Sequence, residues 1–321
     1  MHSAILHRGF VYETASFPSC HASTLLEVPD GILVAFFGGT RERNPDVCIY
    51  TARWDGRQWA PPVEVADGIQ PDGSRWPCWN PVLFQPKGGP IMLFYKVGPS
   101  PSEWWGMVKT SADGGRTWSA AERLPEGILG PIKNKAVQLD NGDILSPTSF
   151  EDDGIGWRVY FERSRDGGRT WQATPWGDHP DGMNAIQPSI LIHGGGHLQA
   201  IGRTRKHGIF QTHSRDNGLT WSRLEPTGLP NPNSGTDAVT LRDGRHLLVY
   251  NDSDTPKVRF PLSVAVSADG QRWEKVLDLE TEPPGEYSYP AVIQASDGRV
   301  HVSYTWKRLR ISHVVLDPQR L

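Results

Sequence analysis

The chain has 321 residues, 37% of them hydrophobic, and 33 basic against 36 acidic residues give a formal net charge of −3. This near balance, without a long run of like charges, gives no sign of binding to nucleic acid or to a membrane surface. No apolar run could span a bilayer, and the first residues lack the apolar core of a signal peptide. The three cysteines, Cys20, Cys48 and Cys78, form neither a disulfide framework nor a CxxC pair. We therefore expect reduced thiols and a cytoplasmic protein.

The predicted elements begin with a strand over Ala4–Tyr12, and six similar units follow it. Each unit opens with a polar residue and continues with an apolar strand, a turn and a second apolar strand. The second strands are predicted at Ile32–Phe37, Ile91–Tyr95, Ile144–Pro147, Leu198–Ile201, His246–Tyr250 and Val300–Tyr304. Runs this short, separated by turn residues and with few helix signals, indicate β-strands.

An eight-residue motif, Ser111-Ala-Asp-Gly-Gly-Arg-Thr-Trp118, recurs along the chain. It returns with small changes from Ser164 and Ser214, and weaker copies start at Thr51 and Ser267. Successive copies start 60, 53, 50 and 53 residues apart, a period that indicates stacked or radially arranged units. Asp-Gly or Asn-Gly supplies the positive φ of a turn, and the Trp ring can pack between units. We interpret the motif as structural, without a catalytic role.

Six units of four strands predict an all-β protein, a six-bladed β-propeller formed by residues 1–321 as a single domain. The last unit, from Tyr289 to about Leu316, carries no copy of the motif and lacks a fourth strand. We expect the N-terminal strand to complete this last blade, because closing the ring removes exposed sheet edges.

In a propeller the first strand of each blade lies nearest the axis, so the residues that open these strands gather around one mouth of the central channel. Here they are His21, Asn80, Lys135, Gln187, Asp237 and Tyr289. Because all six are polar where a core would need apolar residues, we predict a water-filled functional pocket. The residues expected to share its rim follow the second strands and are Arg41, Lys96, Arg203, Arg205, Asn251 and Lys307. The turn-rich tract 229–237 is predicted to be a binding loop.

Motifs of the form Ser-x-Asp-x-Gly-x-Thr-Trp on a six-bladed frame resemble the sialidase (neuraminidase) superfamily, also called BNR-repeat proteins, over essentially the whole chain. Members bind the carboxylate of their substrate with three arginines. They use a Tyr nucleophile, a Glu that assists it and an Asp as acid/base. By the family's spacing, Tyr289 resembles the nucleophile, and Arg203 and Arg259 resemble the second and third arginines. Asp46 is the closest match to the acid/base Asp.

Two positions depart from this pattern. His21 stands where the first arginine is expected, and Gln187 stands where the assisting Glu is expected. A Gln cannot take the Tyr proton as a carboxylate would, and Glu286 is the nearby candidate to replace it. An imidazole at the rim, as predicted for His21, titrates near working pH and suits proton transfer.

Structural interpretations of the same residues stay open. Arg203 or Arg259 could pair with an acidic residue of a neighbouring loop, and Asp46 could cap its own loop. Tyr289 could be a hydrogen-bonded core residue. A free phenol ionises only at a pH of about 10, so a reactive Tyr289 would need a cation or a base beside it.

The resemblance implies a sialidase-type glycoside hydrolase that removes a terminal acidic sugar from an oligosaccharide or glycoconjugate. The His and Cys residues show no metal-ligand spacing and no glycine-rich phosphate loop is present, so we expect no metal and no cofactor. Tyr289 would attack the anomeric carbon, Asp46 would protonate the leaving oxygen and the arginines would hold the carboxylate. One alternative is a polysaccharide lyase, in which His21 or Tyr289 takes the C5 proton of a uronate. The other is a non-catalytic, glycan-binding propeller.

Overall fold

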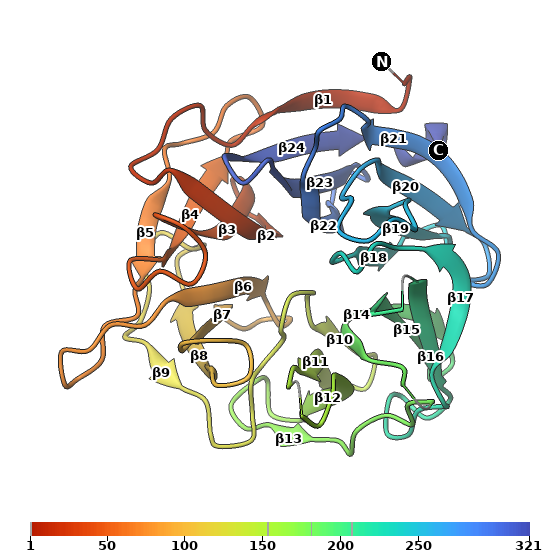
Figure 1. Ribbon diagram of the computed structural model, residues 1–321, viewed down its shortest axis with the longest axis horizontal. Coiled ribbons are helices and arrows are strands. Elements are labelled where there is room, and N and C mark those ends of the chain that lie inside the picture. The colour runs from red at the N-terminus through yellow and green to blue at the C-terminus, as the bar shows by residue number, and fades with distance from the viewer. Residues whose placement is uncertain (1, 153, 181, 207) are drawn as a thin grey trace.

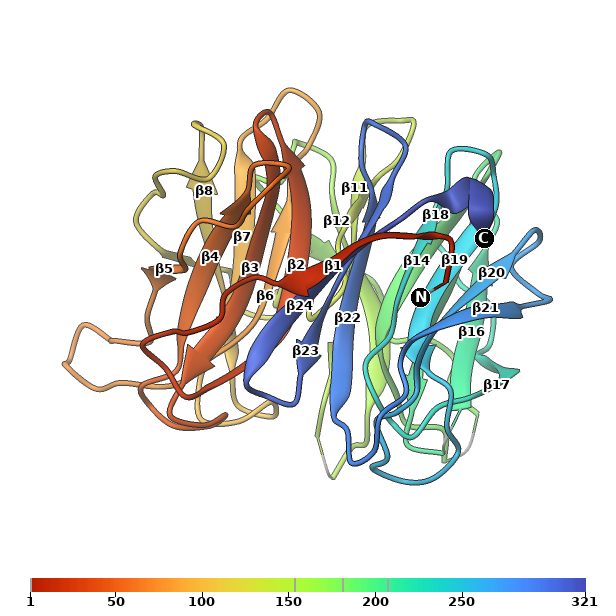
Figure 2. The same ribbon diagram turned by 90° about the horizontal axis from the view of Figure 1, so that it is seen from above.

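Six four-stranded antiparallel sheets surround a central axis (Figure 1). This is a computed structural model, which describes residues 2–152, 154–180, 182–206 and 208–321. Seen from the side, the sheets stand next to one another as blades (Figure 2). The architecture is the predicted six-bladed β-propeller. Within the described ranges, no helix is long and apolar enough to cross a membrane.

In each of the first five blades the strands follow the chain from the axis outward. The first blade consists of β2 (Ser19–Val28), β3 (Gly31–Gly39), β4 (Cys48–Trp54) and β5 (Val63–Ala66). The second consists of β6 (Cys78–Phe84), β7 (Ile91–Val97), β8 (Trp105–Ser111) and β9 (Glu122–Arg123). The third consists of β10 (Val137–Gln138), β11 (Ile144–Phe150), β12 (Arg158–Ser164) and β13 (Gln172–Ala173).

The remaining blades keep this order up to the point where the chain ends. The fourth consists of β14 (Ala185–Gly194), β15 (His197–Thr204), β16 (Gly208–Ser214) and β17 (Glu225–Pro230). The fifth consists of β18 (Asp237–Thr240), β19 (His246–Asn251), β20 (Leu262–Ser267) and β21 (Glu274–Glu280). The sixth has three strands from the C-terminal part of the chain, β22 (Tyr287–Gln294), β23 (Val300–Trp306) and β24 (Arg310–Leu316).

The sixth blade takes its outer strand from the other end of the chain. Strand β1 (Ile5–Phe10) pairs antiparallel with β24, with Phe10 opposite Ser312 and Arg8 opposite Val314. The predicted closure by the N-terminal strand is therefore confirmed, although the strand is shorter than Ala4–Tyr12. Closing the ring in this way pairs the outer edge of β24, which would otherwise be exposed.

The repeated motif forms the turn after the third strand of a blade. In its second copy, the Asp113 carboxylate accepts the hydroxyl of Thr117 and the backbone N–H groups of Arg116 and Thr117. The Ser111 hydroxyl oxygen accepts the backbone N–H of Gly115. These bonds, led by that from the Thr117 side chain, hold the pKa of Asp113 below its ordinary value. The motif thus satisfies the polar groups of its own turn.

The Trp that ends each motif packs towards the preceding blade. Trp221 of the fourth blade stacks on Phe161 of the third, with ring centroids 3.9 Å apart. Trp171 of the third blade meets Phe94 of the second edge-on at 5.8 Å. Aromatic pairs of this kind contribute about 0.5–1.5 kcal/mol beyond the area that they bury. These contacts agree with the structural role predicted for the motif.

Four histidines of the fourth and fifth blades lie in one cluster. His197 Nε2 is 3.1 Å from His213 Nδ1, and His246 Nε2 is 3.3 Å from His193 Nδ1. The rings of His193 and His197 stack at 4.3 Å. Burial, followed by the charge on His193, lowers the pKa of both His197 and His246 to about 4. The folded protein therefore holds these rings neutral.

We predict that His246→Gln reduces the sensitivity of the fold to acid. An unfolded His binds its proton near pH ~6.5, whereas His246 does so only near pH 4 when folded. The unfolded chain thus binds more protons between these values, so stability falls as the pH falls from about 6.5 to about 4. Thermal unfolding at pH 7 and pH 5 should show a smaller loss of Tm in the variant. His2→Gln, at the exposed start of the chain, should keep the wild-type loss. An equal loss in both variants would contradict the prediction.

Candidate active site

Four of the six inner strands contain a bulge close to the mouth. The pairing register shifts between His21 and Thr24, Trp79 and Val82, Ile186 and Ser189, and Ser288 and Ala291. One residue in each bulge has a left-handed backbone, with φ of 57° at Ala22, 36° at Asn80, 56° at Gln187 and 52° at Tyr289. This conformation costs on the order of 1–3 kcal/mol for a residue other than Gly. Bulges also change the direction of side chains. The strained backbone positions are therefore the ones that set the directions of the Gln187 and Tyr289 side chains.

The first blade differs from the sequence prediction by one residue. The residue equivalent to Gln187 and Tyr289 is Ala22, because Ala22 takes the left-handed conformation. His21, predicted as the residue at this position, lies one place earlier and pairs with Phe37. Its side chain still reaches the mouth, with its ring centroid 4.1 Å from that of Tyr289.

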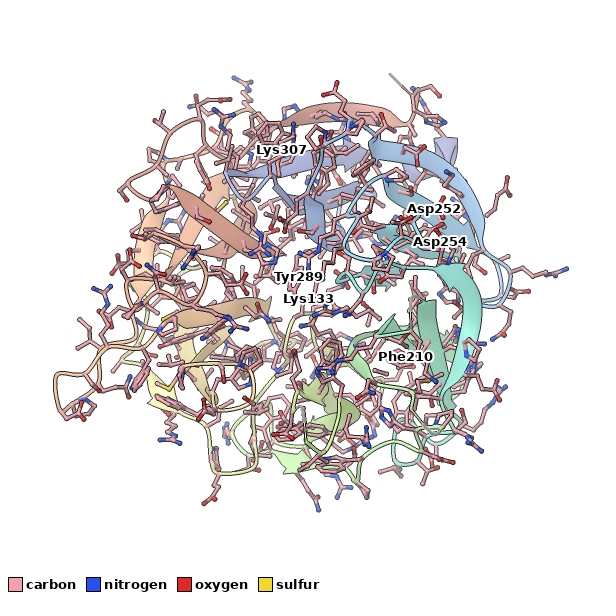
Figure 3. All side chains as sticks on the ribbon, viewed as in Figure 1. Lys133, Phe210, Asp252, Asp254, Tyr289 and Lys307 are labelled. Carbon is pink, nitrogen blue, oxygen red and sulfur yellow. The ribbon has the colours of Figure 1, made fainter. Side chains whose placement is uncertain are left out.

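Tyr289 lies near the axis, beside Lys133 (Figure 3). Its hydroxyl oxygen accepts an N–H from Arg203 Nη2 at 3.0 Å and one from Gln187 Nε2 at 3.4 Å. Within the described ranges, the hydroxyl donates to no protein acceptor. Two donors thus face the phenol oxygen, and its own proton is left to point into the mouth.

Arg203 is held by the tract 229–237 that was predicted to be a binding loop. Its Nη1 donates to the backbone oxygen of Asn233 at 3.0 Å and to the side-chain oxygen at 3.3 Å. Only 6% of Arg203 is exposed, and its Nε has no partner among the residues described. Because a buried N–H without a partner costs about 1–3 kcal/mol, this atom is suited to a ligand or a water.

Lys133 lies beside the Tyr289 ring, with its Nζ 5.7 Å from the ring centre. Its Nζ donates to the backbone oxygens of Pro290 at 2.6 Å and Thr236 at 2.8 Å, and to Asn134 Oδ1 at 2.7 Å. Burial lowers the pKa of Lys133 to about 7, while three acceptors match the three protons of an ammonium group.

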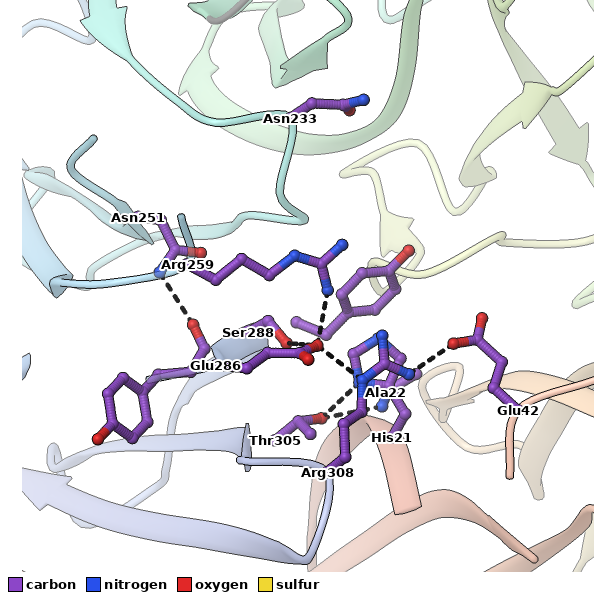
Figure 4. A network of polar contacts seen from close by, with 12 residues as sticks. His21, Ala22, Glu42, Asn233, Asn251, Arg259, Glu286, Ser288, Thr305 and Arg308 are labelled. Carbon is purple, nitrogen blue, oxygen red and sulfur yellow. Dashed lines mark hydrogen bonds and ion pairs between the residues drawn. The ribbon is translucent and has the colours of Figure 1, made fainter. Parts of the chain in front are cut away.

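Arg259 belongs to a chain of alternating charges, drawn in Figure 4. Its Nη1 lies 2.9 Å from Glu286 Oε1, and Arg308 Nε lies 2.6 Å from the same oxygen. Arg308 Nη1 continues the chain to Glu42 Oε2 at 2.5 Å. The guanidinium of Arg259 lies 6.0 Å from the centre of the Tyr289 ring. Arg259 therefore reaches the mouth already paired with a carboxylate, which is the structural interpretation left open by the sequence.

Glu286 does not occupy the place predicted for it. Burial raises its pKa, but the charges of Arg308 and Arg259 outweigh this effect and hold the pKa below its ordinary value. Its hydrogen bonds are with these two arginines and Ser288. Glu286 thus holds the guanidinium groups in place and is poorly suited to take the Tyr289 proton.

Arg308 is a mouth residue that the sequence prediction missed. It lies with Lys307 in the turn 307–309 between β23 and β24, where these two successive residues have left-handed backbones with φ of 61° and 53°. Such turns favour Asn-Gly, so a Lys-Arg pair gives no sequence signal. Lys307, which was predicted, lies farther from the axis than Tyr289 (Figure 3). Its Nζ is 4.9 Å from the centre of the Trp306 ring.

His21 is buried and neutral, which differs from the titrating rim residue that we expected. Its Nδ1 lies 2.9 Å from Thr305 Oγ1, and only 2% of the residue is exposed. Burial, followed by the charges of Arg308, Arg259, Arg203 and Lys133, holds its pKa well below the ordinary value. A ring that binds protons so weakly is a poor general base at neutral pH.

Asp46 is bound within its own loop. Its Oδ2 accepts the backbone N–H of Thr40 at 2.9 Å and the Thr40 hydroxyl at 2.7 Å. Burial raises the pKa of Asp46, but the bonds from Thr40 outweigh it and the pKa lies below its ordinary value. The capping role is thus present. An acid role for Asp46 stays a prediction and would require these bonds to loosen.

Two of the predicted mouth residues neutralise each other. Lys135 Nζ lies 2.9 Å from Asp237 Oδ2. Asp237 also accepts the Ser189 hydroxyl and the backbone N–H of Val292, at 2.8 Å each. The pair therefore joins the third, fourth, fifth and sixth blades at the axis, and its bonding capacity is largely used in doing so.

Lys96 was wrongly predicted to lie at the rim. It is fully buried, and its Nζ donates to the backbone oxygen of Pro131 at 2.7 Å. Burial lowers its pKa to about 7. Asn251 is also buried and donates to the backbone oxygens of Pro261 and Tyr287. Asn80 is buried and Arg41 is exposed, and their predicted binding roles stay predictions.

Glu151 is a second residue that the sequence prediction missed. It follows β11 in the third blade, and its Oε1 lies 3.4 Å from Gln187 Nε2. Burial raises the pKa of Glu151, although Arg203 and Arg205 oppose this effect. Arg205 also stacks on Trp157, with its guanidinium carbon 4.1 Å from the ring centre. The mouth therefore holds a carboxylate on the Gln187 side of Tyr289.

A family model described as a BNR repeat-like domain matches residues 30–302 of this chain. The chain belongs to this family. A sialidase of Micromonospora viridifaciens is 25% identical over 298 residues, covering 87% of this chain and 39% of that protein. The chain spans about two fifths of the curated relatives it matches.

Solved structures share the fold over nearly the whole chain. A protein of unknown function from Dyadobacter fermentans has a TM-score of 0.79 at 20% identity and covers 98% of both chains. The NanB sialidase of Streptococcus pneumoniae has a TM-score of 0.76 at 13% identity, covering 98% of this chain and 71% of that one. The BNR-repeat protein described here is thus a sialidase-like propeller.

We predict that Asp237→Ala destabilises the fold by about 3–5 kcal/mol, because it leaves two buried donors and the partly buried Lys135 ammonium without their partner. Denaturant unfolding followed by tryptophan fluorescence measures this change. Asp254→Asn, an exposed residue of the same blade, is the matched control and should change stability by less than about 0.5 kcal/mol. Equal effects of the two substitutions would show that Asp237 is not the hub of these contacts.

Proposed function

We propose that this protein is an exo-acting glycosidase that removes a terminal sugar bearing a carboxylate from a glycan. The observation that carries the proposal is the surroundings of the Tyr289 hydroxyl. It accepts an N–H from Arg203 and donates to no protein group within the described ranges. A phenol that is approached only by donors is poised to act through its oxygen, either as a nucleophile or as a proton acceptor.

The positive charges around Tyr289 support a substrate that carries a carboxylate. Arg203 and Arg259 lie 5.5 and 6.0 Å from the centre of its ring. Guanidinium groups bind carboxylates through charge-assisted, often bidentate, hydrogen bonds. Relatives named sialidases match the chain in sequence and in fold, and Arg203 and Arg259 stand at two of the three arginine positions that the resemblance implies. Both observations support a glycoconjugate as the substrate.

The proposed reaction uses Tyr289 as the nucleophile. Its oxygen forms a bond to the anomeric carbon while the glycosidic bond breaks and the leaving oxygen takes a proton. Water then attacks the anomeric carbon and restores the phenol, as in glycosidases that use a Tyr in place of a carboxylate nucleophile. Asp46 remains the proposed proton donor to the leaving oxygen.

A lyase that uses His21 as the base receives less support. Taking a proton from carbon needs a group that is open to the substrate and basic enough at working pH. His21 is buried against Thr305 and its pKa lies well below the ordinary value. Tyr289 would have to be the base of any lyase reaction at this mouth.

We predict that Tyr289→Phe abolishes turnover and leaves the fold intact. The ring that packs against His21 is kept, whereas the reacting oxygen is removed. Steady-state assays should show a fall in kcat of at least about 1,000-fold, with thermal unfolding close to that of the wild type. Retention of the wild-type rate would remove Tyr289 from the mechanism.

One experiment separates the candidate activities. The protein is incubated with terminal sialosides and with oligosaccharides capped by a uronate, and both released reducing sugar and ultraviolet absorbance are followed. Reducing sugar without new absorbance supports the glycosidase. Absorbance from an unsaturated uronate would replace it by a lyase. Binding in calorimetry without either signal would indicate a non-catalytic, glycan-binding propeller.

A further inference from the structure

We propose that Glu151 accepts the proton of Tyr289 through a single water molecule held beside Gln187. This inference rests on the proposed function, because it gives the nucleophile of that reaction its base. It assigns the role to a loop of the third blade, while Gln187 and Tyr289 lie at the bulges of the inner strands of the fourth and sixth blades.

The geometry places Glu151 one step from the phenol. Gln187 Nε2 lies 3.4 Å from Glu151 Oε1 and 3.4 Å from the Tyr289 oxygen. Two oxygens that each lie 3.4 Å from one nitrogen are less than about 7 Å apart, and one water beside that nitrogen can contact both. The amide itself offers only N–H donors to both oxygens, so it orients them and cannot carry the proton between them.

Gln187 also gives a separate sign of a bound molecule. Only 1% of the residue is exposed, and its Oε1 has no hydrogen-bond partner among the residues described. A buried amide oxygen is rarely left unsatisfied, and an ordered water is the usual partner. A water here can donate one proton to Gln187 Oε1 and the other to Glu151 while it accepts from Tyr289.

The other candidate bases at the mouth are occupied. Glu286 is held by Arg259 and Arg308, and Asp46 is held by Thr40. His21 is buried against Thr305, and its pKa lies well below the ordinary value. Among the described residues, Glu151 is the carboxylate that the hydrogen bonds connect to the Tyr289 hydroxyl.

The charges around Glu151 suit a group that exchanges protons. Arg203 and Arg205 face it from the fourth blade, and Glu42 faces it from the first. Burial is the largest effect and raises the pKa of Glu151, the two arginines lower it and Glu42 raises it again. A carboxyl whose pKa lies above its ordinary value, closer to neutral pH, is a stronger base than one held low, as Glu286 is.

The proton balance closes within the proposed reaction. As the Tyr289 oxygen bonds to the anomeric carbon, its O–H bond breaks and the proton passes through the water to the Glu151 carboxylate. The leaving oxygen takes its proton from the general acid. In the second step, water displaces Tyr289, the phenolate regains its proton from Glu151, and the proton of the attacking water restores the acid.

The test is a loss and a designed rescue. Glu151→Gln should lower kcat about 100-fold or more and leave KM within about threefold of the wild-type value. It should also remove the acidic limb of the kcat profile against pH. Asp152→Asn is the matched control, because among the described residues the neighbouring Asp152 carboxylate accepts the backbone N–H groups of Gly154 and Ile155 and contacts no group of the mouth. It should keep the wild-type rate.

The rescue places a carboxylate directly beside the phenol. Glu151→Gln combined with Gln187→Glu should recover at least about tenfold in kcat, because the new carboxylate takes the position 3.4 Å from the Tyr289 oxygen. A merely structural role of Glu151 predicts no such recovery. Lack of rescue in a folded double variant, with an unchanged pH profile in the single one, would overturn the proposal.

Leaving groups separate a base from an acid. A base for Tyr289 predicts that Glu151→Gln slows aryl and alkyl glycosides by similar factors. Loss confined to alkyl glycosides, whose leaving oxygen needs a proton, would instead make Glu151 the general acid and overturn the assignment.

A readout without turnover keeps this inference distinct from the proposed function. In protein labelled with ¹³C at the tyrosine Cζ, the Tyr289 signal, identified with Tyr289→Phe, should shift as Glu151 titrates in mildly acidic solution. Glu151→Gln should remove that shift. If no substrate is turned over but the shift is present, the proposed function fails while the Glu151–Tyr289 coupling stands. A signal unaffected by Glu151→Gln overturns the coupling.

Discussion

Pairing of β1 with β24 is the constraint on which the mouth depends. His21 comes from the first blade and Tyr289 from the last, yet their rings lie 4.1 Å apart. The two blades are neighbours only because the ring closes, and the first residues of the chain hold the last blade in its sheet. A ring that opened at this seam would separate His21 and Glu42 from Tyr289, Glu286 and Arg308. The site is therefore a property of the closed ring, and no single blade contains it.

Much of the fold could be predicted because the repeat is encoded locally. Ser111 and Asp113 satisfy the polar groups of their own turn, so each copy of the motif specifies the same local geometry wherever it occurs. The five copies mark five blades. The last unit, which has no copy and lacks a fourth strand, marks the sixth blade and predicts the closure. The position of His21 was off by one residue because the bulge in β2 is centred on Ala22, and an Ala carries no sign of a left-handed backbone.

The site could be predicted only in part. Repeat register identified Gln187, Arg203 and Tyr289, which the structure brings into one hydrogen-bonded group. It missed Glu151 and Arg308, because both lie in loops that the repeat does not align. It also could not assign partners to charges. Lys135 comes just before the inner strand of the third blade, yet its side chain reaches Asp237 of the fifth blade and forms an ion pair there. That choice depends on which blades face each other, which no local pattern records.

The charges at the mouth are nearly balanced, and this shapes how a ligand can act. Glu286 and Glu42 neutralise the two neighbouring arginines, Arg259 and Arg308, and fix their guanidinium groups. These two arginines therefore lose little side-chain freedom when a ligand binds. The Nε of Arg203 has no partner in the part of the chain that the structure describes, so Arg203 has the most to gain from a ligand carboxylate.

A carboxylate bound at Arg203 would also change Glu151. It would offset the positive charge of Arg203, which lowers the pKa of Glu151 against the effect of burial. In addition, a nearby negative charge disfavours ionisation of a second carboxyl group. Both effects raise the proton affinity of Glu151, so the proposed base would be strongest when an acidic sugar occupies the mouth. A neutral sugar of the same shape would lack this effect, which couples recognition of the acid group to activation of Tyr289.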